Sequence, residues 1–263
     1  MGVLVTDGAG ERLAGGFVND VRRVGDTVRR STGPWTPAVH ALLAHLQAHD
    51  FPAPRVLGID QRGREILTFL EGEPIGWTDW PPVMRGTDGL RQLAGMLRRY
   101  HDVVRSFHPP PDAVWRNPLS LPTAELIRHG DFSPFNTLWR DDRLVGVIDW
   151  DFAQPGMAIT DLAYLAWYGV PLQSDGRTDQ YGLARPVDRA GRLRTLADAY
   201  GAYSPAEVVE AAVVAIETER DQTIELARRG LQPWQGFAAD GLAPALTADA
   251  DWIVAHRAEL VAG

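Results

Sequence analysis

The sequence has 263 residues, of which 45% are hydrophobic and 23% are charged, and its formal net charge is −8 at pH 7. This length can bury a substantial core in one large domain or two lobes, and the negative charge argues against a general nucleic-acid binder. None of the 26 basic residues is lysine and no residue is cysteine, which excludes a Walker A phosphate loop, a Schiff-base lysine and a disulfide framework.

The first 70 residues are rich in short β-prone segments that are separated by glycine-containing turns. Gly25-Asp26 fits a two-residue hairpin loop with glycine at its first central position, and a second reversal is expected at Gln61–Gly63. Between the hairpins we expect one helix, with Thr36 as its N-cap and Pro37 in its first turn. The predicted strands are Val3–Val5, Val18–Val24, Thr27–Arg30, Val56–Ile59 and Glu65–Leu70.

From about residue 86 the pattern becomes helical, with an amphipathic stripe that includes Leu90, Leu93 and Leu97. His101, at the end of this stripe, is interpreted as a packed structural histidine. Another helix is expected to start at Ser204, because Ser204 and Glu207 form a capping box with proline at the first helical position. Residues 157–263 are therefore predicted to be mostly helical.

The segment Arg128–Asp151 holds two polar clusters that flank a predicted hairpin and reads RHGDFSPFNTLWRDDRLVGVIDWD. The hairpin places Asp131, Asn136 and Asp149 in loops or at strand ends, where catalytic groups on a rigid scaffold usually lie. One carboxylate and one amide on a loop, followed by a second carboxylate after the next strand, suit magnesium and a phosphoryl group. Magnesium prefers a few such oxygens and takes its other ligands from phosphate and water.

The motifs HGDFSPFN, VIDWDFAQPG and DLA, in this order, resemble the aminoglycoside phosphotransferase group of the protein-kinase-like superfamily. The resemblance implies an α+β, bilobal protein-kinase-like fold. Residues 1–71 would form a small antiparallel β-rich N-terminal lobe with one helix, which binds the nucleotide. Residues 72–263 would form a larger, mainly helical C-terminal lobe with the catalytic loop and the acceptor site.

The kinase template also implies roles for the motif residues. Asp131 would receive the proton of the acceptor hydroxyl, and His129 would orient the catalytic loop. Asn136 and Asp149 would hold Mg²⁺, and Asp161 would support the catalytic loop. Asp151 is open to three interpretations: a further metal ligand, a structural acceptor or a contact to the substrate.

The nucleotide side departs from the family pattern in three ways. Only Gly15-Gly16 stands where the family has a full G-x-G-x-x-G loop over the phosphates, so this segment could also be a simple turn. Arg30 lies where the family presents a phosphate-contacting lysine, and His40 lies on the helix face that normally offers its glutamate partner. Alternatively, Arg29 and Arg30 simply point to solvent on a polar strand. The resemblance places the following residues around the nucleotide, which would be ATP or GTP: Gly15, Gly16, Val28, Arg30, Phe69 and Leu70.

Acidic residues gather near the end of the helix that starts at Ser204. They are Glu217, Glu219, Asp221 and Glu225. In aminoglycoside enzymes the helical lobe supplies acidic groups to a polycationic substrate, so Glu217 and Asp221 are candidates for acceptor contacts. A solvated helix face neutralised by neighbouring arginines is the alternative.

These features favour a Mg²⁺-dependent phosphotransferase that moves the γ-phosphate of a nucleotide to a hydroxyl of a small molecule. The acceptor could be aminoglycoside-like or another amine-bearing compound, which would allow a role in antibiotic resistance. A nucleotide- or ligand-binding module with little or no transfer activity is the alternative that Arg30 and His40 motivate. A metal hydrolase that uses His129 and the nearby aspartates would need a second histidine from a distant position.

The expected environment follows from what the sequence lacks. It has no apolar run of about 18 residues, so we expect no membrane span and no membrane partner. The N-terminal segment lacks a basic region followed by an apolar core, which together with the absence of cysteine favours a cytoplasmic protein. Both a monomer and a homodimer remain open.

Overall fold

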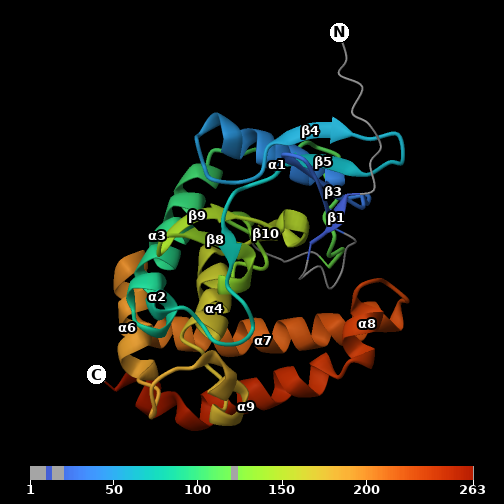
Figure 1. The fold of residues 1–263 in the computed structure, drawn as a ribbon. Helices are drawn as coiled ribbons and strands as arrows, with labels where there is room; N and C mark the ends of the chain where they lie inside the picture. Colours follow the sequence, from blue (N-terminus) through green and yellow to red (C-terminus); the bar gives the residue numbers. More distant parts are fainter. Residues whose placement is uncertain (1–9, 14–20, 120–123, 263) are drawn as a thin grey trace.

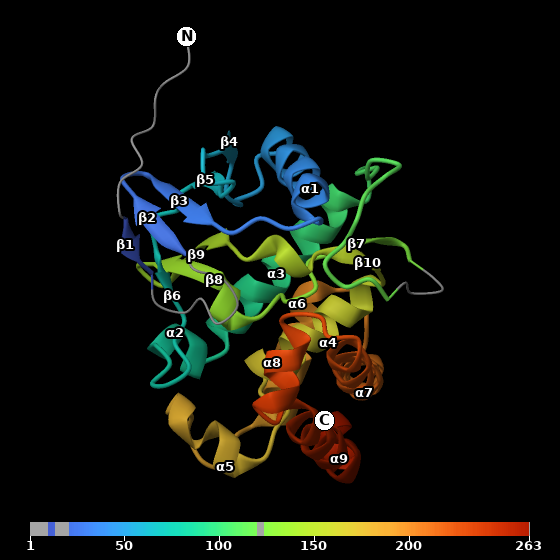
Figure 2. The same ribbon diagram turned by 90° about the vertical axis from the view of Figure 1, so that its right-hand side faces the viewer.

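The structure is a computed structural model, and it describes residues 10–13, 21–119 and 124–262. Figures 1 and 2 show a β-rich part with helix α1 on one side of the molecule and a larger helical part on the other, with short strands between them. The β-rich part consists of β1 (Glu11–Arg12), β2 (Arg22–Val24), β3 (Thr27–Arg30), α1 (Thr36–Ala48), β4 (Val56–Ile59) and β5 (Glu65–Thr68). The predicted small sheet with one helix is therefore confirmed.

The five strands of this part form one antiparallel sheet in the order β1-β2-β3-β5-β4. Gly25 and Asp26 close the β2–β3 hairpin, since Val24 pairs with Thr27. Gly25 has a φ of 60°, which glycine adopts without steric cost, so the predicted hairpin loop is confirmed.

The pairing of β3 with β5 determines which side chains meet in the sheet. Arg30 lies directly opposite Glu65, and Val28 lies opposite Leu67. Side chains alternate along a strand, so these four residues project from the same face of the sheet. That face lines the cavity described below.

One strand prediction differs from the structure, two fall wholly or partly outside the described residues, and one short strand was not predicted. Val3–Val5 and the first part of Val18–Val24 lie outside the described residues. Strand β5 ends at Thr68, two residues before the predicted end at Leu70, and the chain then leads to the next small sheet. Strand β1 was not predicted, and its two residues are too few to give a periodic signal.

The start of α1 differs from the prediction by one residue. Thr36 is the first helical residue, and Trp35 occupies the cap position. The Thr36 hydroxyl accepts a hydrogen bond from the Gly33 N–H at 2.9 Å. It therefore closes the preceding turn and does not cap the helix.

The helical part contains most of the chain. Its helices are α2 (Pro82–Arg85), α3 (Asp88–Val104), α4 (Ala158–Gly169), α5 (Asp175–Thr178), α6 (Arg189–Tyr200), α7 (Pro205–Arg228), α8 (Trp234–Ala239) and α9 (Leu242–Val261). The predicted capping box of α7 is present, since the Ser204 N–H donates to Glu207 at 2.8 Å and the Ser204 hydroxyl accepts the Glu207 N–H at 3.3 Å. Helix α7 packs against α4 and α9. Within the described residues no helix is long and apolar enough to cross a membrane.

Two small sheets position the polar motifs between the β-rich and helical parts. One pairs β7 (Leu126–Arg128) with β10 (Gln154–Gly156), and the other has the order β6-β8-β9. Strands β6 (Glu73–Pro74), β8 (Thr137–Arg140) and β9 (Arg143–Val147) form this second sheet. Because Asp131 follows β7, Asn136 precedes β8 and Asp149 follows β9, the predicted hairpin brings the motif residues together.

A buried arginine, Arg192 of α6, joins the ends of two other helices. Its guanidinium donates to five backbone carbonyls at the C-terminal ends of α2 and α4: Met84, Arg85, Gly86, Gly169 and Val170, at 2.6–3.2 Å. These carbonyls have no partner within their own helices and carry the negative end of the helix dipole. Burial lowers the pKa of Arg192 to about 10.

We expect Arg192→Met to destabilise the fold by about 3 kcal/mol or more, because it leaves several buried carbonyls without a donor. The matched control is Arg194→Met, on the exposed side of the same helix. Urea unfolding of both variants measures the difference. Equal stability of the two variants would show that the carbonyls do not depend on Arg192.

Candidate active site

Asp161, at the start of α4, holds the backbone of the loop that follows β7. Its carboxylate accepts the His129 N–H at 2.7 Å and the Gly130 N–H at 3.0 Å. His101 of α3 donates to the same carboxylate at 3.3 Å and also contacts the Tyr200 hydroxyl at 2.7 Å. Asp161 therefore has the supporting role that the family resemblance implied, and His101 is the packed structural histidine that the sequence predicted.

Gly130 allows this loop to pass close to the segment after β9. It has a φ of 84°, and a Cβ atom at this position would lie 2.0 Å from the Phe152 carbonyl oxygen. Any larger residue would have to push the two segments apart. The H-G-D motif therefore needs its glycine for close backbone packing.

His129 connects the same two segments through its imidazole ring. Its Nδ1 accepts the Asp131 N–H at 3.2 Å, and its Nε2 donates to the Ile148 carbonyl at 3.1 Å. Burial lowers the pKa of His129 to about 4, so the ring is neutral and can donate a hydrogen bond from one nitrogen while it accepts one at the other. This geometry fits the orienting role expected for His129.

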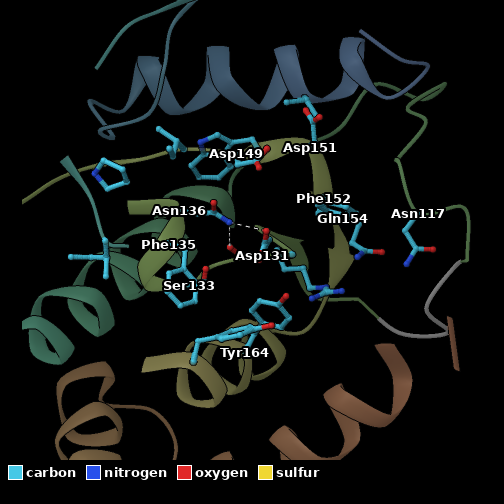
Figure 3. A pocket seen from close by; sticks show the side chains of 18 of the residues that line it. Asn117, Asp131, Ser133, Phe135, Asn136, Asp149, Asp151, Phe152, Gln154 and Tyr164 are labelled. Carbon is cyan, nitrogen blue, oxygen red and sulfur yellow. Dashed lines mark hydrogen bonds between the residues drawn. The ribbon is translucent and has the colours of Figure 1, made fainter. Parts of the chain in front are cut away.

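Asp131 faces a cavity and is held by Asn136 (Figure 3). The Asn136 amide nitrogen donates to the Asp131 carboxylate at 2.7 Å and to its backbone carbonyl at 2.9 Å. Burial raises the pKa of Asp131 to about 8, and the nearby charges of Asp149 and Glu219 act in the same direction. A cation that bound beside this carboxylate would lower its pKa again.

Asn136 and Asp149 could offer a magnesium ion one amide oxygen and one carboxylate. The Asn136 nitrogen is used on Asp131, which leaves its Oδ1 for a cation, and Asp149 is partly exposed to the cavity. Such a set fits Mg²⁺ whose other ligands are phosphate and water. Within residues 10–13, 21–119 and 124–262, no group of three or more His, Asp or Glu side chains is arranged to hold a metal ion.

Arg30 does not point to solvent, which corrects one interpretation of the sequence. Its guanidinium makes ion pairs with Glu65 (Nε–Oε1, 3.1 Å), with Asp149 (Nη1–Oδ1, 3.2 Å) and with Asp151. Its acidic partner in the sheet is therefore Glu65 of β5, opposite Arg30. His40 donates to Glu65 at 2.9 Å, so it supports this pair from α1.

Asp151 is enclosed by two arginines. Arg116 donates to its Oδ2 at 2.8 Å, whereas Arg30 contacts its Oδ1. The Arg116 guanidinium lies over the rings of Trp35 at 4.4 Å and Phe152 at 5.1 Å. Asp151 is therefore an anchor for two cations. Sequence reasoning missed Arg116 because the segment between α3 and β7 has no periodic pattern.

Asp131, Asn136, Asp149, Asp151 and Arg30 border one cavity of about 1680 Å³ between the β-rich and helical parts. Typical ligand pockets measure roughly 300–1,000 Å³, so this cavity has room for a nucleotide and an acceptor together. Val28, Arg30, Phe69 and Leu70, which the resemblance places around the nucleotide, line this cavity. Gly15 and Gly16 lie outside the described residues.

The acidic residues of α7 divide between the cavity and the solvent. Glu217 is exposed and Asp221 pairs with Arg220 at 2.8 Å, and neither lines the cavity. Glu219 does line it, and burial raises the pKa of Glu219 to about 7, while Arg128 acts in the opposite direction. Tyr164 and Tyr168 lie near enough to Glu219 to interact with its charge. The aromatic residues that line the cavity are Trp77, Phe135, Phe152, Tyr164, Tyr168, Trp234 and Phe237.

Comparison with known proteins gives matches in sequence and in fold. The model of the phosphotransferase enzyme family matches residues 111–205. The trifolitoxin immunity protein of Rhizobium leguminosarum bv. trifolii is 38% identical over 195 residues, which cover 72% of this chain and 73% of that protein.

Solved structures with kinase-like folds superpose over most of the chain. The ethanolamine kinase of Plasmodium vivax has a TM-score of 0.61 at 11% identity, over 94% of this chain and 84% of that one. The GDP complex of aminoglycoside 2′-phosphotransferase-IIIa has a TM-score of 0.56 at 16% identity, over 94% of each chain. These similarities confirm the α+β, protein-kinase-like fold.

We expect Asp161→Asn to lower the free energy of unfolding by about 3 kcal/mol, because the buried N–H groups lose a charged acceptor. His101 lowers the pKa of Asp161 against the effect of burial, so this stability is present at neutral pH and is lost on acidification below about pH 4. Denaturation between pH 3 and about pH 7 checks both points. Asp102→Asn, on the exposed face of α3, is the control. An equal loss of unfolding free energy in both variants would contradict the role assigned to Asp161.

Proposed function

The chain belongs to the phosphotransferase enzyme family, and from this we propose that it transfers the γ-phosphate of ATP or GTP to a hydroxyl of a small molecule. The observation that carries the proposal is the Asp131–Asn136 pair, which lies beside Asp149 in a cavity with room for two ligands. We further propose the division into lobes at residues 1–71 and 72–263, because the first sheet ends just before this boundary.

In the proposed reaction, the acceptor oxygen forms a bond to the γ-phosphorus and the bond from this phosphorus to the β–γ bridging oxygen breaks. Asp131 accepts the hydroxyl proton, and the Asn136 amide keeps the carboxylate aimed at the acceptor. Mg²⁺ held by Asn136 and Asp149 would neutralise charge on the phosphate oxygens. Most of the rate gain would come from position and electrostatics, because little covalent chemistry is asked of the protein.

The acceptor that this site fits best carries an amine as well as a hydroxyl. Glu219 lines the cavity, and it makes no hydrogen bond or ion pair with another described residue. The aromatic residues that line the same cavity suit a cation, because ring faces attract positive charge. The named activities of the ethanolamine kinase and the aminoglycoside phosphotransferase support this class of acceptor.

A second candidate function has its own supporting observation. Arg30 occupies the carboxylate that should bind magnesium, which would suit a module that binds a nucleotide or ligand with little transfer. The relative is named as an immunity protein, and protection against a toxic compound could follow from either modification or sequestration. The phosphate-transfer assay below separates the two.

Asp131→Ala should reduce phosphate transfer at least about a hundredfold and leave nucleotide binding nearly unchanged, because the carboxylate acts on the acceptor hydroxyl. Radiolabelled ATP and GTP, incubated with ethanolamine, choline and aminoglycosides, measure transfer, and calorimetry measures binding. Asp112→Ala, in an exposed loop, is the control. Equal turnover in the wild type and Asp131→Ala would refute the assignment, and nucleotide binding without transfer to any acceptor would favour the binding module.

Glu219→Gln should raise KM for an amine-bearing acceptor about tenfold, because a charge-assisted contact is lost. The pKa of Glu219 is about 7, so its charge appears as pH rises, and the wild-type KM should fall from pH 6 to about pH 8. Glu219→Gln should remove this dependence.

The groups that face Glu219 are Arg128, Asp131, Tyr164 and Tyr168, and of these Asp131 also titrates near this range. Its titration should appear in kcat in both proteins, which separates it from the effect on KM. Glu217→Gln, two residues away on the exposed face, is the matched control. A neutral hydroxyl acceptor should show no change in KM, and an equal change for both acceptors would contradict a role in amine binding.

A further inference from the structure

Arg30 joins three carboxylates that come from three different segments. Its planar guanidinium has donors on three nitrogens, and each nitrogen faces a different acid: Glu65 of β5, and Asp149 and Asp151 after β9. Only 10% of the Arg30 side chain is exposed, so its charge depends on these partners. Asp149, one of the three, is also the proposed ligand for the metal.

The three contacts of Arg30 are unequal. The side chains of Glu65 and Asp151 are each 4% exposed, whereas that of Asp149 is 39% exposed. Asp151 also has Arg116, and Glu65 also has His40. Arg30 can therefore give up Asp149, whose carboxylate water or a cation can reach, while it keeps its two buried partners.

A divalent cation and Arg30 compete for the same carboxylate. With Arg30 on Asp149 Oδ1, a metal ion at Asp149 would place two positive charges close together in a partly buried site, where repulsion is stronger than in water. A triphosphate changes this balance, because its oxygens attract the guanidinium and also supply ligands to the metal. Metal and nucleotide would then bind cooperatively.

We propose that Arg30 is a latch on the metal site, which withholds Asp149 from a divalent cation until the phosphates of a nucleotide draw the guanidinium away. This inference rests on the proposed function and extends it, because it makes metal binding depend on the nucleotide. An arginine suits the latch better than the lysine of related enzymes. Its fork can hold several carboxylates at once, whereas an ammonium group is a compact point charge.

The test uses Mn²⁺ as the metal and measures its binding to the full chain by electron paramagnetic resonance, with and without a non-hydrolysable ATP analogue. Manganese accepts the same oxygen ligands as magnesium. Without nucleotide, Arg30→Met should bind Mn²⁺ at least about tenfold more tightly than the wild type, because the competing cation is gone. With the analogue, wild-type affinity for Mn²⁺ should rise, and this rise should be smaller in Arg30→Met.

Two further variants keep the result interpretable. Arg64→Met removes a cation that pairs with Asp60, and it should bind Mn²⁺ like the wild type, which excludes a general effect of net charge. Arg30→Lys keeps a positive charge, so it carries the test if Arg30→Met fails to fold. Its gain in Mn²⁺ affinity should be intermediate, because lysine cannot span all three carboxylates.

The outcomes separate the latch from the proposed function. Equal Mn²⁺ affinity of the wild type and both Arg30 variants without nucleotide would overturn the latch, and transfer activity could still be intact. Failure of every protein to bind Mn²⁺, even with the analogue, would overturn both proposals. A gain in both Arg30 variants with none in Arg64→Met supports the latch.

Discussion

The geometry of the site depends on the carboxylate of Asp161. Burial alone would raise its pKa, but the hydrogen bond and charge of His101 lower it, so it stays ionised. An ionised acceptor can hold the N–H groups of His129 and Gly130 firmly, and these fix the turn that presents Asp131. Because His101 also reaches Tyr200, the turn is fastened to α3, α4 and α6 together.

Charge is distributed unequally on the two sides of Asp131. Towards the β-rich part, Arg30 and Arg116 converge on Asp151, and towards α7 the cavity presents Glu219 with two tyrosines near it. Figure 3 shows Asp149 and Asp151 on one side of Asp131 and Tyr164 on the other. In the proposed reaction this arrangement orients both ligands, since an anionic triphosphate favours the arginines and an amine favours the carboxylate.

Features that depend on local residue spacing were predicted correctly from the sequence. Contacts that depend on the pairing of distant segments were not. Asp131, Asn136 and Asp149 could be placed because each lies beside a short, recognisable strand, and the capping box at Ser204 is a contact over three residues. The acidic partner of Arg30 could not be predicted. The sequence indicated both of the strands that carry Arg30 and Glu65, but it did not indicate that these two strands pair. The presence of an acidic residue, Glu65, and a basic residue, Arg30, in two short strands could have indicated this pairing, since both side chains are buried opposite each other. Arg116 gave no signal at all.

The acidic residues of α7 show a different limit, which is the tertiary packing of the helix. The α7 residues that line the cavity recur at intervals of three and four along one face: Glu207, Glu210, Ala211, Val214, Ala215, Thr218, Glu219 and Gln222. Glu217 and Asp221 do not line the cavity and are exposed, although each follows a lining residue, Glu210 or Val214, by seven positions. Composition indicated an acidic segment, but only the packing of α7 against the rest of the fold makes Glu219 the member of this group that lines the cavity. The core residues Val208, Val209, Ala212 and Ile216 occupy the adjacent face, so the specificity of the cavity can vary without disturbing the core.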